Sequence, residues 1–570
     1  MMRRLFAILS LTLLVASSCN IDEEYAEGGV PTIELDIPSG CYAAKVGNEL
    51  TIAPRYGNTD ASTTYAWSHD GVRVASTPTY SFTPEKAERQ YLTLEVTNQY
   101  GRAKRDIRVD IVERDVAKIS LAGAYEGFTT AIDEVLPLRP YVEECALPIS
   151  YSWRIDEREV ATTRDYDFCT SQEGKYRLSL SATTEDGTTR IAFDVTVCKA
   201  EDMPFEWHFE QKEYNMSAGR TILLRPLNAR EEDKTTYTWS VDGCVAQQSG
   251  KCSFEFSSTK QGTHTVSVTS AREQISRTQH LTINVCATEG TYFRASTAAS
   301  SASWATVYEL RAAPGQFINE DFVASTAEEA CRMADERMRK GAYISLGGFG
   351  GYMVMGFDHS ITASGGYDIA IRGNAFDTSS EPAIVYVMQD ENGDGAPNDT
   401  WYELAGSETG KAETMRDYEV TYYRPTASAM AVEWRDNRGG SGTIDYLPSK
   451  HDQPSYYPQW LDVTHYTLRG TRLEARNYDS TGNGATWILP PYDWGYADNF
   501  SSVDGATNDG TNRFRIVDAI DHNGASVKLA YIDFVKVQTA CHSSSGWLGE
   551  SSSEVCGAYD CSMMERRATK

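Results

Sequence analysis

Short stretches of alternating apolar and polar residues recur along the first half of the chain. Residues 91–97, 176–182 and 263–269 alternate in this way, and a period of two places successive side chains on opposite faces of a half-buried strand. A second alternating run follows each of them, at residues 107–112, 191–197 and 281–285. The pattern predicts pairs of antiparallel strands in three successive units.

A short phrase of the form Tyr-x-Trp-x-x-Asp precedes each pair of predicted strands. Its tryptophans, Trp67, Trp153 and Trp239, recur every 86 residues, so the front of the chain is a tandem array. A unit of this length, with several short strands and a Trp on a central one, is typical of an immunoglobulin-type β-sandwich. We expect the three tryptophans in the cores of these units; the alternative is that they stack on sugars.

The phrase and the strands that follow it resemble PKD-like domains, which are immunoglobulin-type modules common in bacterial surface proteins. The second copy departs from the pattern, because Glu157 stands where the other copies have Gly. We expect PKD-like domains at residues 30–113, 114–200 and 201–288. The resemblance implies that the modules space and display another domain and carry no chemistry themselves.

Residues 291–562 contain no copy of the repeat. Thr326 and Glu329 form a capping box before an amphipathic run, which predicts a helix over residues 326–340. Most of the remainder has the composition of strands separated by Gly, Asn and Asp turns, which is typical of a jelly-roll-like sandwich. The expected fold is therefore mainly β, with three tandem Ig-like (PKD-like) β-sandwiches followed by a larger jelly-roll-like β-sandwich with one helix.

The first residues have the features of an export signal. Arg3 and Arg4 precede an apolar run at residues 5–16 that is too short to span a membrane. We expect residues 1–18 to be a lipoprotein signal peptide, because Ser17-Ser18-Cys19 resembles a bacterial lipobox in which Cys19 receives the lipid anchor.

Residues 19–29 would then form an acidic tether. Its Asp22-Glu23-Glu24 stretch resembles the signal that sends lipoproteins of Bacteroidetes to the outer face of the outer membrane. The alternative is a solvated tether that does not specify a face. The resemblance implies an outer-membrane protein, lipid-anchored and exposed at the cell surface.

Charge and cysteine content narrow the classes of partner. The formal net charge of the 570 residues is −27, and such a chain is repelled by the phosphates of nucleic acids, which we therefore exclude as partners. An exported protein is in a compartment that permits disulfides. Cys244 and Cys252 bracket a hairpin-length segment, and we predict a local disulfide between them; the alternative is that they remain free thiols.

The loop from Asp390 to Asp399 has the spacing of the first half of an EF-hand-type calcium loop. Asp390, Asn392 and Asp394 stand at positions 1, 3 and 5, with Gly at position 6. Trp401 occupies position 12, where a bidentate Glu is expected, and Asp399 or Glu403 is a candidate substitute. We predict a structural Ca²⁺ ion held by Asp390, Asn392, Asp394 and Asp399; the alternative is a metal-free turn rich in Asn, Asp and Gly.

Residues 347–351, 367–376 and 532–537 resemble the C-terminal domain of PKD-containing cell-surface lipoproteins from gut Bacteroidetes. The resemblance implies nutrient capture or adhesion, and some such proteins occur beside TonB-dependent transporters, including transporters for corrinoids. The glycines of residues 347–356 lack the Lys-Ser/Thr that follows a phosphate-binding loop. We attribute them to close backbone packing at a sheet edge.

Two loops punctuated by proline carry several aromatic residues whose flat faces could stack on a sugar ring or another flat ligand. The alternative is that these rings fill the ends of the core. The predicted ligand-binding residues are Tyr456, Tyr457, Trp460, Tyr492, Asp493, Trp494 and Tyr496.

Catalytic motifs are absent from the sequence, which has no Gly-x-Ser-x-Gly elbow and no His-Glu-x-x-His helix. The carboxylates considered for glycoside hydrolysis are Glu381, Asp493, Asp498 and Asp358, which is followed by His359. We therefore expect a protein that is not an enzyme and that captures a glycan or a corrinoid for uptake. The alternatives are an adhesin or accessory subunit docking on a TonB-dependent transporter, and a glycoside-active enzyme.

Overall fold

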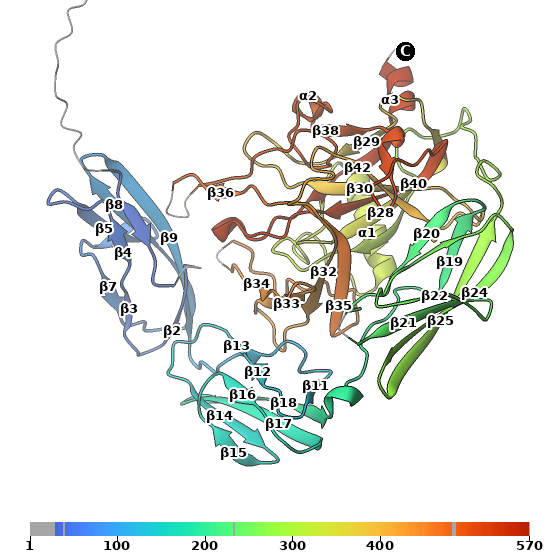
Figure 1. Cartoon of the computed structure of the whole chain (residues 1–570). Coiled ribbons are helices and arrows are strands. Elements are labelled where there is room, and N and C mark those ends of the chain that lie inside the picture. Colours follow the sequence, from blue (N-terminus) through green and yellow to red (C-terminus); the bar gives the residue numbers. More distant parts are fainter. Residues whose placement is uncertain (1–28, 38–39, 232–233, 449, 482–485, 569–570) are drawn as a thin grey trace, which may run out of the picture.

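The computed structural model describes residues 29–37, 40–231, 234–448, 450–481 and 486–568. The fold is mainly β, as the alternation predicts, with tandem Ig-like units in the first half and a larger β-rich C-terminal region (Figure 1). The expected signal peptide, Cys19 and most of the acidic tether lie outside the described residues. Among the described residues, no helix has the length and hydropathy needed to cross a membrane.

The first unit contains three sheets with an Ig-like arrangement, one of which is the pair β1-β4. Its larger sheet has the order β2-β9-β8-β5-β6, in which β2 runs parallel to β9 and the other pairs are antiparallel, and β3 pairs with β7 in the second sheet. The strands are β1 (Thr32–Glu34), β2 (Cys41–Lys45), β3 (Leu50–Ile52), β4 (Arg55–Gly57), β5 (Thr64–His69), β6 (Val72–Ala75), β7 (Tyr80–Phe82), β8 (Glu88–Asn98) and β9 (Gly101–Val112).

The second and third units repeat this topology, with the orders β11-β18-β17-β14-β15 and β19-β25-β24-β21-β22. In both larger sheets, the strand that comes first along the chain again pairs in parallel with the strand that comes last, β11 with β18 and β19 with β25. The second unit consists of β10 (Ile119–Ser120), β11 (Phe128–Ala131), β12 (Leu136–Leu138), β13 (Tyr141–Val142), β14 (Ser150–Ile155), β15 (Arg158–Ala161), β16 (Tyr166–Phe168), β17 (Gly174–Thr184) and β18 (Gly187–Cys198). The third consists of a 3₁₀ turn (Ala200–Asp202), β19 (Glu213–Ser217), β20 (Thr221–Leu224), β21 (Thr236–Val241), β22 (Cys244–Ser249), β23 (Phe254–Ser257), β24 (Gly262–Arg272) and β25 (Ile275–Cys286).

The repeated tryptophans are core residues, as predicted. Trp67, Trp153 and Trp239 are fully buried on the equivalent strands β5, β14 and β21. Each ring lies 5.4–5.5 Å from an aromatic ring of the smaller sheet. In each unit one indole therefore joins the five-stranded sheet to the strand pair that carries this second ring, which leaves no face of the indole for a sugar.

The predicted disulfide in the third unit is wrong. Cys244 is an exposed thiol at the start of β22, whereas Cys252 is a buried thiol beyond its end, with Sγ near Glu231. The six residues of an extended strand span about 20 Å, and a disulfide requires Cα atoms within about 7 Å of each other. The intervening segment is thus a strand, not a turn that folds back on itself.

The C-terminal region is built on a six-stranded sheet of order β26-β28-β40-β30-β31-β39, accompanied by a three-stranded sheet, β38-β29-β42, and a four-stranded sheet, β34-β33-β32-β35. Side chains from the six-stranded and three-stranded sheets share one apolar core, to which helix α1 contributes Ala330, Ala334 and Met338. The elements up to residue 444 are β26 (Thr306–Arg311), α1 (Ala327–Arg339), β27 (Ile344–Ser345), β28 (Tyr352–Thr362), β29 (Ile369–Arg372), β30 (Ala383–Met388), β31 (Trp401–Leu404), β32 (Met415–Tyr423), β33 (Val432–Asp436) and β34 (Ser441–Ile444).

The remaining elements are β35 (His465–Arg472), β36 (Tyr478–Asp479), β37 (Trp487–Ile488), α2 (Ala506–Asp509), β38 (Thr511–Phe514), β39 (Ala519–Ile520), β40 (Tyr531–Thr539), β41 (Glu554–Val555), β42 (Gly557–Asp560) and α3 (Cys561–Ala568), with 3₁₀ turns at Ile516–Asp518 and Gly546–Leu548. Helix α1 begins as predicted, because Thr326 accepts a hydrogen bond from the backbone N–H of Glu329 at 3.1 Å. The Glu329 carboxylate in turn accepts the N–H of Ser325 at 2.9 Å.

The glycines of residues 347–351 permit close backbone packing. A Cβ at Gly347 would lie 2.0 Å from the carbonyl oxygen of Ala313, and a Cβ at Gly351 would lie 1.9 Å from that of Leu346. The N–H of Gly347 also donates to the hydroxyl of Ser552 at 3.1 Å. The crowding expected from the sequence is confirmed, and it fixes the segment that precedes β41.

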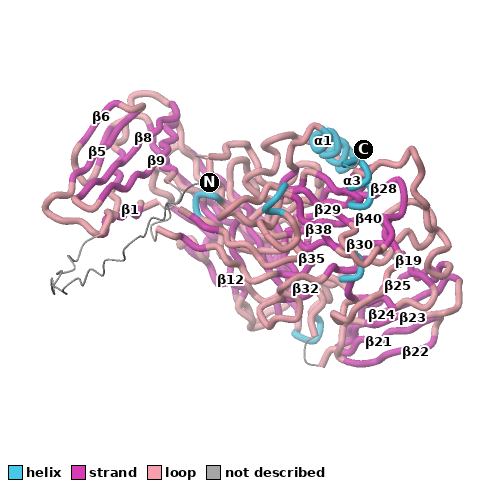
Figure 2. Tube along the Cα trace, turned by 90° about the horizontal axis from the view of Figure 1, so that it is seen from above, coloured by secondary structure: helices cyan, strands magenta, loops and turns pink. Residues whose placement is uncertain are grey.

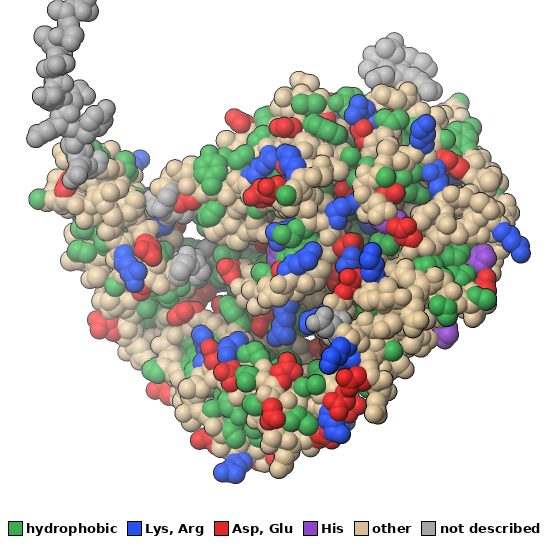
Figure 3. All heavy atoms as spheres, in the orientation of Figure 1, with side chains coloured by type: hydrophobic (Ala, Val, Ile, Leu, Met, Phe, Trp, Pro, Cys, Tyr) green, Lys and Arg blue, Asp and Glu red, His purple; other side chains and the backbone are tan. Residues whose placement is uncertain are grey.

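The three units curve around the C-terminal region (Figure 1), with the first and third at opposite ends (Figure 2). The first unit contacts it through the buried Arg108, which donates to the carbonyl of Pro448, and through a 2.6 Å ion pair between Arg89 and Asp452. In the second unit the carbonyl of Ile119 accepts a hydrogen bond from Thr426 at 2.5 Å. Acidic and basic side chains are interspersed over the face of the molecule that Figure 3 shows.

The third unit makes a buried polar interface with the C-terminal region. Glu419 accepts the N–H of Asn228 at 3.0 Å and pairs with Arg469, which also donates to the carbonyl of Pro226 at 2.6 Å. The N–H of Ser217 donates to Glu391 at 3.0 Å. Because buried polar groups are costly when unpaired, these bonds specify one docking geometry for this unit.

The hairpin turn that follows each Trp-containing strand differs between the units in its conformational energy. Asp70-Gly71 and Asp242-Gly243 have positive φ at both residues, as a tight hairpin turn requires. In the second unit Glu157 adopts φ +67° at the glycine position. A side chain with Cβ in the left-handed region costs about 1–2 kcal/mol, so the second unit is strained at its turn.

Replacing Glu157 by Gly should relieve this strain and slow native-state hydrogen exchange in β14 and β15 by roughly fivefold, the factor that corresponds to about 1 kcal/mol. The loss of the exposed ion pair with Arg190, at 2.9 Å, should offset little of the gain. The reciprocal control, Gly243→Glu, should accelerate exchange in β21 and β22. Unchanged or faster exchange in the Glu157→Gly variant would contradict the assignment of strain.

Candidate functional site

Five of the predicted ligand-binding aromatics are core residues. Their side chains are at most 5% exposed, so their rings offer no face to a ligand, and the prediction that they form an exposed stacking surface is wrong. They are Tyr456, Tyr457, Trp460, Tyr492 and Tyr496.

The polar atoms of these rings are satisfied inside the protein. The hydroxyl of Tyr456 donates to the carbonyl of His451 at 2.7 Å, and the indole N–H of Trp460 donates to the carbonyl of Leu310 at 3.0 Å. The hydroxyl of Tyr496 accepts the N–H of Glu408 at 2.9 Å. The proline-punctuated loops therefore pack their rings inward, where each hydroxyl or N–H ties a loop to the core.

Trp494 and Asp493 differ from these residues. Asp493 is exposed and Trp494 is half-buried, and Trp494 lines a cavity of about 240 Å³. The sequence therefore locates one aromatic residue at an open site. The other lining residues are Tyr367, Leu404, Ala405, Gly495, Val503, Asp504, Arg513, Phe514, Arg515 and Asp518.

Charged groups surround this cavity in pre-arranged pairs. Arg515 binds Asp518 at 2.8 Å, and Arg513 binds Asp509 at 2.6 Å. Asp504 accepts the side-chain amide of Asn512 at 2.9 Å. The walls of the cavity thus combine apolar rings with donors and acceptors whose orientations are fixed by neighbours.

The loop from Asp390 to Asp399 is folded on its own hydrogen bonds. The carboxylate of Asp390 accepts the N–H groups of Gly393 and Gly395, at 2.7 and 3.1 Å. Asn392 accepts the N–H of Asp394 at 2.9 Å, and Asp394 accepts that of Ala396 at 2.8 Å. The oxygens at positions 1, 3 and 5 therefore already cap the turn, which fits the metal-free alternative.

One atom of this loop has no such partner. Oδ1 of Asp399 is buried without a hydrogen bond, while its other oxygen accepts the N–H of Glu391 at 3.0 Å. Burial, followed by the charges of Glu391 and other loop carboxylates, raises the pKa of Asp399 to about 8. Ca²⁺ at Asp390, Asn392, Asp394 and Asp399 stays a prediction, and the loop does not gather three carboxylates around one point.

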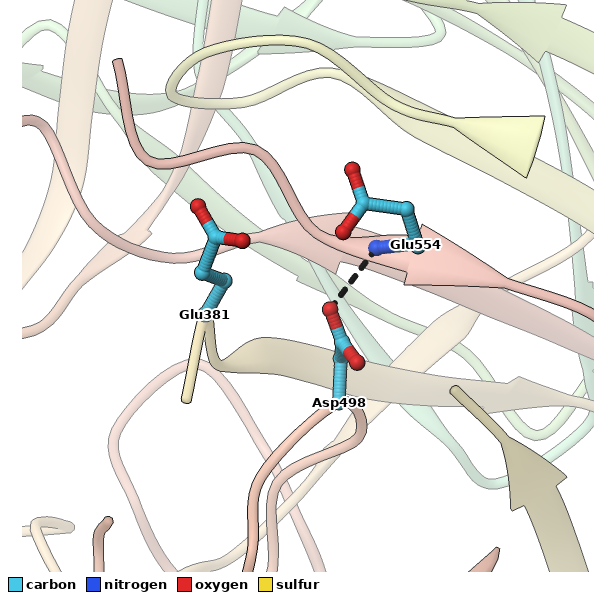
Figure 4. Close-up of side chains that lie close together, drawn as sticks. All are labelled: Glu381, Asp498 and Glu554. Carbon is cyan, nitrogen blue, oxygen red and sulfur yellow. Dashed lines mark hydrogen bonds between the residues drawn. The ribbon is translucent and has the colours of Figure 1, made fainter. Parts of the chain in front are cut away.

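Three other carboxylates do converge on one point. Glu381, Asp498 and Glu554 each offer an oxygen atom within 4.8 Å of the other two, and in the part of the chain that the structure describes they are the one such group of three or more potential ligands. Figure 4 shows the three side chains directed toward one another from separate segments. Glu381 precedes β30, Asp498 lies between β37 and α2, and Glu554 begins β41.

The backbone fixes this carboxylate group. Asp498 accepts three N–H groups, from Asn374 and Ala375 at 2.8 Å each and from Glu554 at 2.9 Å. Asp498 itself has φ +50°, a conformation that costs energy for a residue with a Cβ and that often marks a functional site. Glu381 accepts the N–H of Ser552 at 2.9 Å.

Electrostatics disfavour full ionisation of the group. Burial, reinforced by the charge of Asp498, raises the pKa of Glu381 to about 8. Burial also raises the pKa of Asp498 to about 6, although its three N–H donors oppose the shift. The pKa of Glu554 is raised well above its usual range by burial and by the charges of Glu381 and Asp498.

Glu381 and Asp498 were among the carboxylates considered for glycoside hydrolysis, and the structure brings them together. Glu554 was not predicted, because the segment Ser551-Ser-Ser-Glu554 matches no ligand motif. Its one signal is a charged residue at the start of a short strand in an otherwise uncharged stretch. None of the three carboxylates lines the 240 Å³ cavity.

The pair Asp358-His359 does not form a catalytic triad among the described residues. Both ring nitrogens of the buried His359 bind carboxylates, Asp358 at 2.6 Å and Asp560 at 2.9 Å. A general base needs a free ring nitrogen facing a nucleophile. His359 instead ties β28 to the end of β42.

Comparison with known proteins finds PKD-like domains at residues 30–98 and 117–184. These matches lie in the first two repeated units and leave the C-terminal region unmatched. No curated protein matches the chain.

The fibronectin(III)-like modules of Clostridium thermocellum CbhA are 14% identical, over 31% of this chain and 99% of theirs, with a TM-score of 0.18. Extracellular domains 3–5 of Drosophila OTK are 12% identical, over 45% and 99%, also at 0.18. Three N-terminal domains of the bacteriophage RB49 highly immunogenic outer capsid protein are 12% identical, over 46% and 100%, at 0.18. Scores this low do not show a shared overall arrangement, and no conclusion is drawn from them.

The raised pKa values predict how stability depends on pH when no cation is present. Between pH 4 and pH 8 the carboxyls of Glu381, Asp498 and Glu554 are ionised in the unfolded chain but resist ionisation in the folded protein. The free energy of unfolding should therefore fall as the pH rises through this window. The three carboxylates that face one another are Glu381, Asp498 and Glu554, and the charge of the buried Glu550 also acts on Glu554. In EDTA, the melting temperature of the C-terminal region should be higher at pH 5 than at pH 8.

Glu381→Gln should flatten this dependence, because it removes one group with a raised pKa. Glu408→Gln is the matched control, since Glu408 is a buried Glu held by Lys411 and Arg476 at 2.9 Å each. A profile that Glu381→Gln leaves unchanged would show that the carboxylate group does not control the pH dependence.

Proposed function

We propose that this protein is a non-catalytic, surface-anchored binding protein that captures a glycan at the cavity beside Trp494. The observation that carries the proposal is the cavity itself, in which the one predicted aromatic residue with an accessible face meets fixed charged groups. Sites for small molecules combine apolar walls with a few oriented polar groups in this way.

The composition of the cavity favours a sugar. The indole of Trp494 and the half-exposed ring of Tyr367 supply apolar faces for a pyranose ring. Arg515, Asp504 and Asp518 supply donors and acceptors for hydroxyl groups. A volume of about 240 Å³ suits the end of a glycan chain better than a corrinoid, whose macrocycle and nucleotide loop are far larger.

A catalytic role has less support. The carboxylate group is the best candidate for acid–base chemistry, but the cavity that Ser380, Pro382 and Ser551, neighbours of Glu381 and Ser552 in sequence, help to line has room for about one water, 10 Å³. A glycosidase needs a cleft in which the scissile bond lies between its carboxylates. Neither this cavity nor the one beside Trp494 is lined by Glu381, Asp498 or Glu554, so the glycoside-active alternative has less support than a binding role.

The array gives this binding region a fixed orientation. The third unit is held by Glu391, Glu419 and Arg469, and the first and second units touch the loops around residues 426–452. In our proposal the lipid on Cys19 anchors the chain at the cell surface, the PKD-like array braces the C-terminal region, and a TonB-dependent transporter receives the captured ligand.

Trp494→Ala should weaken glycan binding at least about fivefold, because stacking on an aromatic ring contributes on the order of 1 kcal/mol or more. The fold should survive, since Trp494 is half-buried. The measurement is a glycan array followed by calorimetry on the full chain. Trp460→Ala is the contrasting variant, because it empties a core site and should destabilise the region by about 3–5 kcal/mol. Unaltered binding by Trp494→Ala would place the ligand elsewhere.

Cys19→Ala should transfer the protein from the membrane fraction to the soluble fraction, because the lipid is the anchor that the sequence predicts. Cys169→Ala, which removes an exposed thiol in the second unit, should leave the protein in the membrane fraction. Retention of the Cys19→Ala variant in membranes would show that another feature anchors the chain.

A further inference from the structure

The spacing of Glu381, Asp498 and Glu554 matches the coordination sphere of one metal ion. Calcium binds oxygen ligands at 2.3–2.6 Å, so two oxygens on the same ion lie no more than about 5 Å apart. One oxygen from each of the three carboxylates meets this limit with both of the others, within 4.8 Å. The three residues come from segments that are distant in sequence, so the fold itself assembles the group.

A second observation points to a missing ligand. Glu554 is only 6% exposed, and its Oε1 atom is buried without a hydrogen-bond partner. A buried polar atom without a partner costs about 1–3 kcal/mol. The neighbouring carboxylates of Glu381 and Asp498 cannot relieve that cost when ionised, because a carboxylate only accepts hydrogen bonds.

The group also lacks a basic partner. Over the described residues no Lys, Arg or His side chain forms an ion pair with Glu381, Asp498 or Glu554, and the carboxylate of Glu550 adds a further repulsive charge that acts on Glu554. Charges buried in proteins are paired or bind metals. Three converging carboxylates without a basic partner are therefore neutralised by protons or by a cation.

We propose that Glu381, Asp498 and Glu554 bind one hard divalent cation, with Ca²⁺ the first choice. The ligands are all oxygen atoms, with no Cys or His among them, and oxygen ligands select Ca²⁺, Mg²⁺ or Mn²⁺. The three N–H groups on Asp498 orient its carboxylate and leave a lone pair for the ion. The N–H of Ser552 orients Glu381 in the same way.

Such an ion would join three parts of the C-terminal region. It would link the start of β30, the first residue of β41 and the loop that carries both Asp498 and Trp494. Asp498 lies four residues after Trp494, so the ion would hold one end of the loop that lines the cavity. This consequence rests on the proposed glycan site, whereas the cation site itself does not.

The test is a Ca²⁺ titration of the full chain in detergent after treatment with EDTA, followed by calorimetry and by the melting temperature. We expect Ca²⁺ to bind and to raise the melting temperature, because an ion that binds only the folded state stabilises it. Asp498→Asn and Glu554→Gln should each weaken Ca²⁺ binding at least about tenfold. Circular dichroism in EDTA checks that both variants fold.

Two control variants locate the ion. Glu550→Gln alters a buried carboxylate that lies outside the group of three and that accepts the N–H of Gln316 at 3.1 Å, so Ca²⁺ affinity should change less than in the ligand variants. Asp394→Asn alters the 390–399 loop and should leave this site intact. Loss of the Ca²⁺ effect in Asp394→Asn, with retention in Asp498→Asn, would assign the ion to the loop and overturn the proposal.

The remaining outcomes also decide the matter. Absence of any effect of Ca²⁺, Mg²⁺ or Mn²⁺ on the wild-type chain would overturn the proposal and assign the group to carboxyls that share protons. Glycan binding is measured separately with and without EDTA. Cation binding without glycan binding would contradict the proposed function alone, whereas glycan binding without cation binding would contradict this inference alone.

Discussion

Carboxylates from Glu381, Asp498 and Glu554 meet inside the C-terminal region, and their mutual repulsion has to be cancelled for the region to remain folded. Protons or a divalent cation are the two ways to cancel it. The surrounding structure is built to hold the group whichever is present. Asp498 is fixed by three N–H groups, and the packing of the 347–351 glycines positions the segment that carries Ser552 and Glu554.

The same principle operates at the interface between the third unit and the C-terminal region. Glu391 and Glu419 are buried there, and each is satisfied by a backbone N–H of the third unit, from Ser217 and Asn228 respectively. An interface made of specific acceptors tolerates one geometry, while an apolar contact would tolerate several. The third unit of the array therefore packs against the C-terminal region in one geometry, which is more than the spacing role that the resemblance to PKD-like domains implies.

The sequence predicted those features that depend on local patterns. The Trp67 phrase and the alternating strands indicated Ig-like units, and Thr326 indicated the start of a helix, because each signal lies within a few residues. The sequence did not predict features that depend on tertiary packing, such as the burial of a side chain or the convergence of distant residues. The residues that neighbour Tyr456 in the sequence do not reveal whether its ring faces the solvent or the core. Glu554 became visible only when folding placed it beside two carboxylates that are far away in the chain.

Diffraction from crystals of the full chain grown with Mn²⁺, a hard cation with an anomalous signal, tests the central claim most directly. The account predicts one anomalous peak bonded to oxygens of Glu381, Asp498 and Glu554, since carboxylate ligands suit Mn²⁺ as well as Ca²⁺. Absence of a peak there, with the carboxyl groups hydrogen-bonded to one another, would contradict it and show that protons alone stabilise the group.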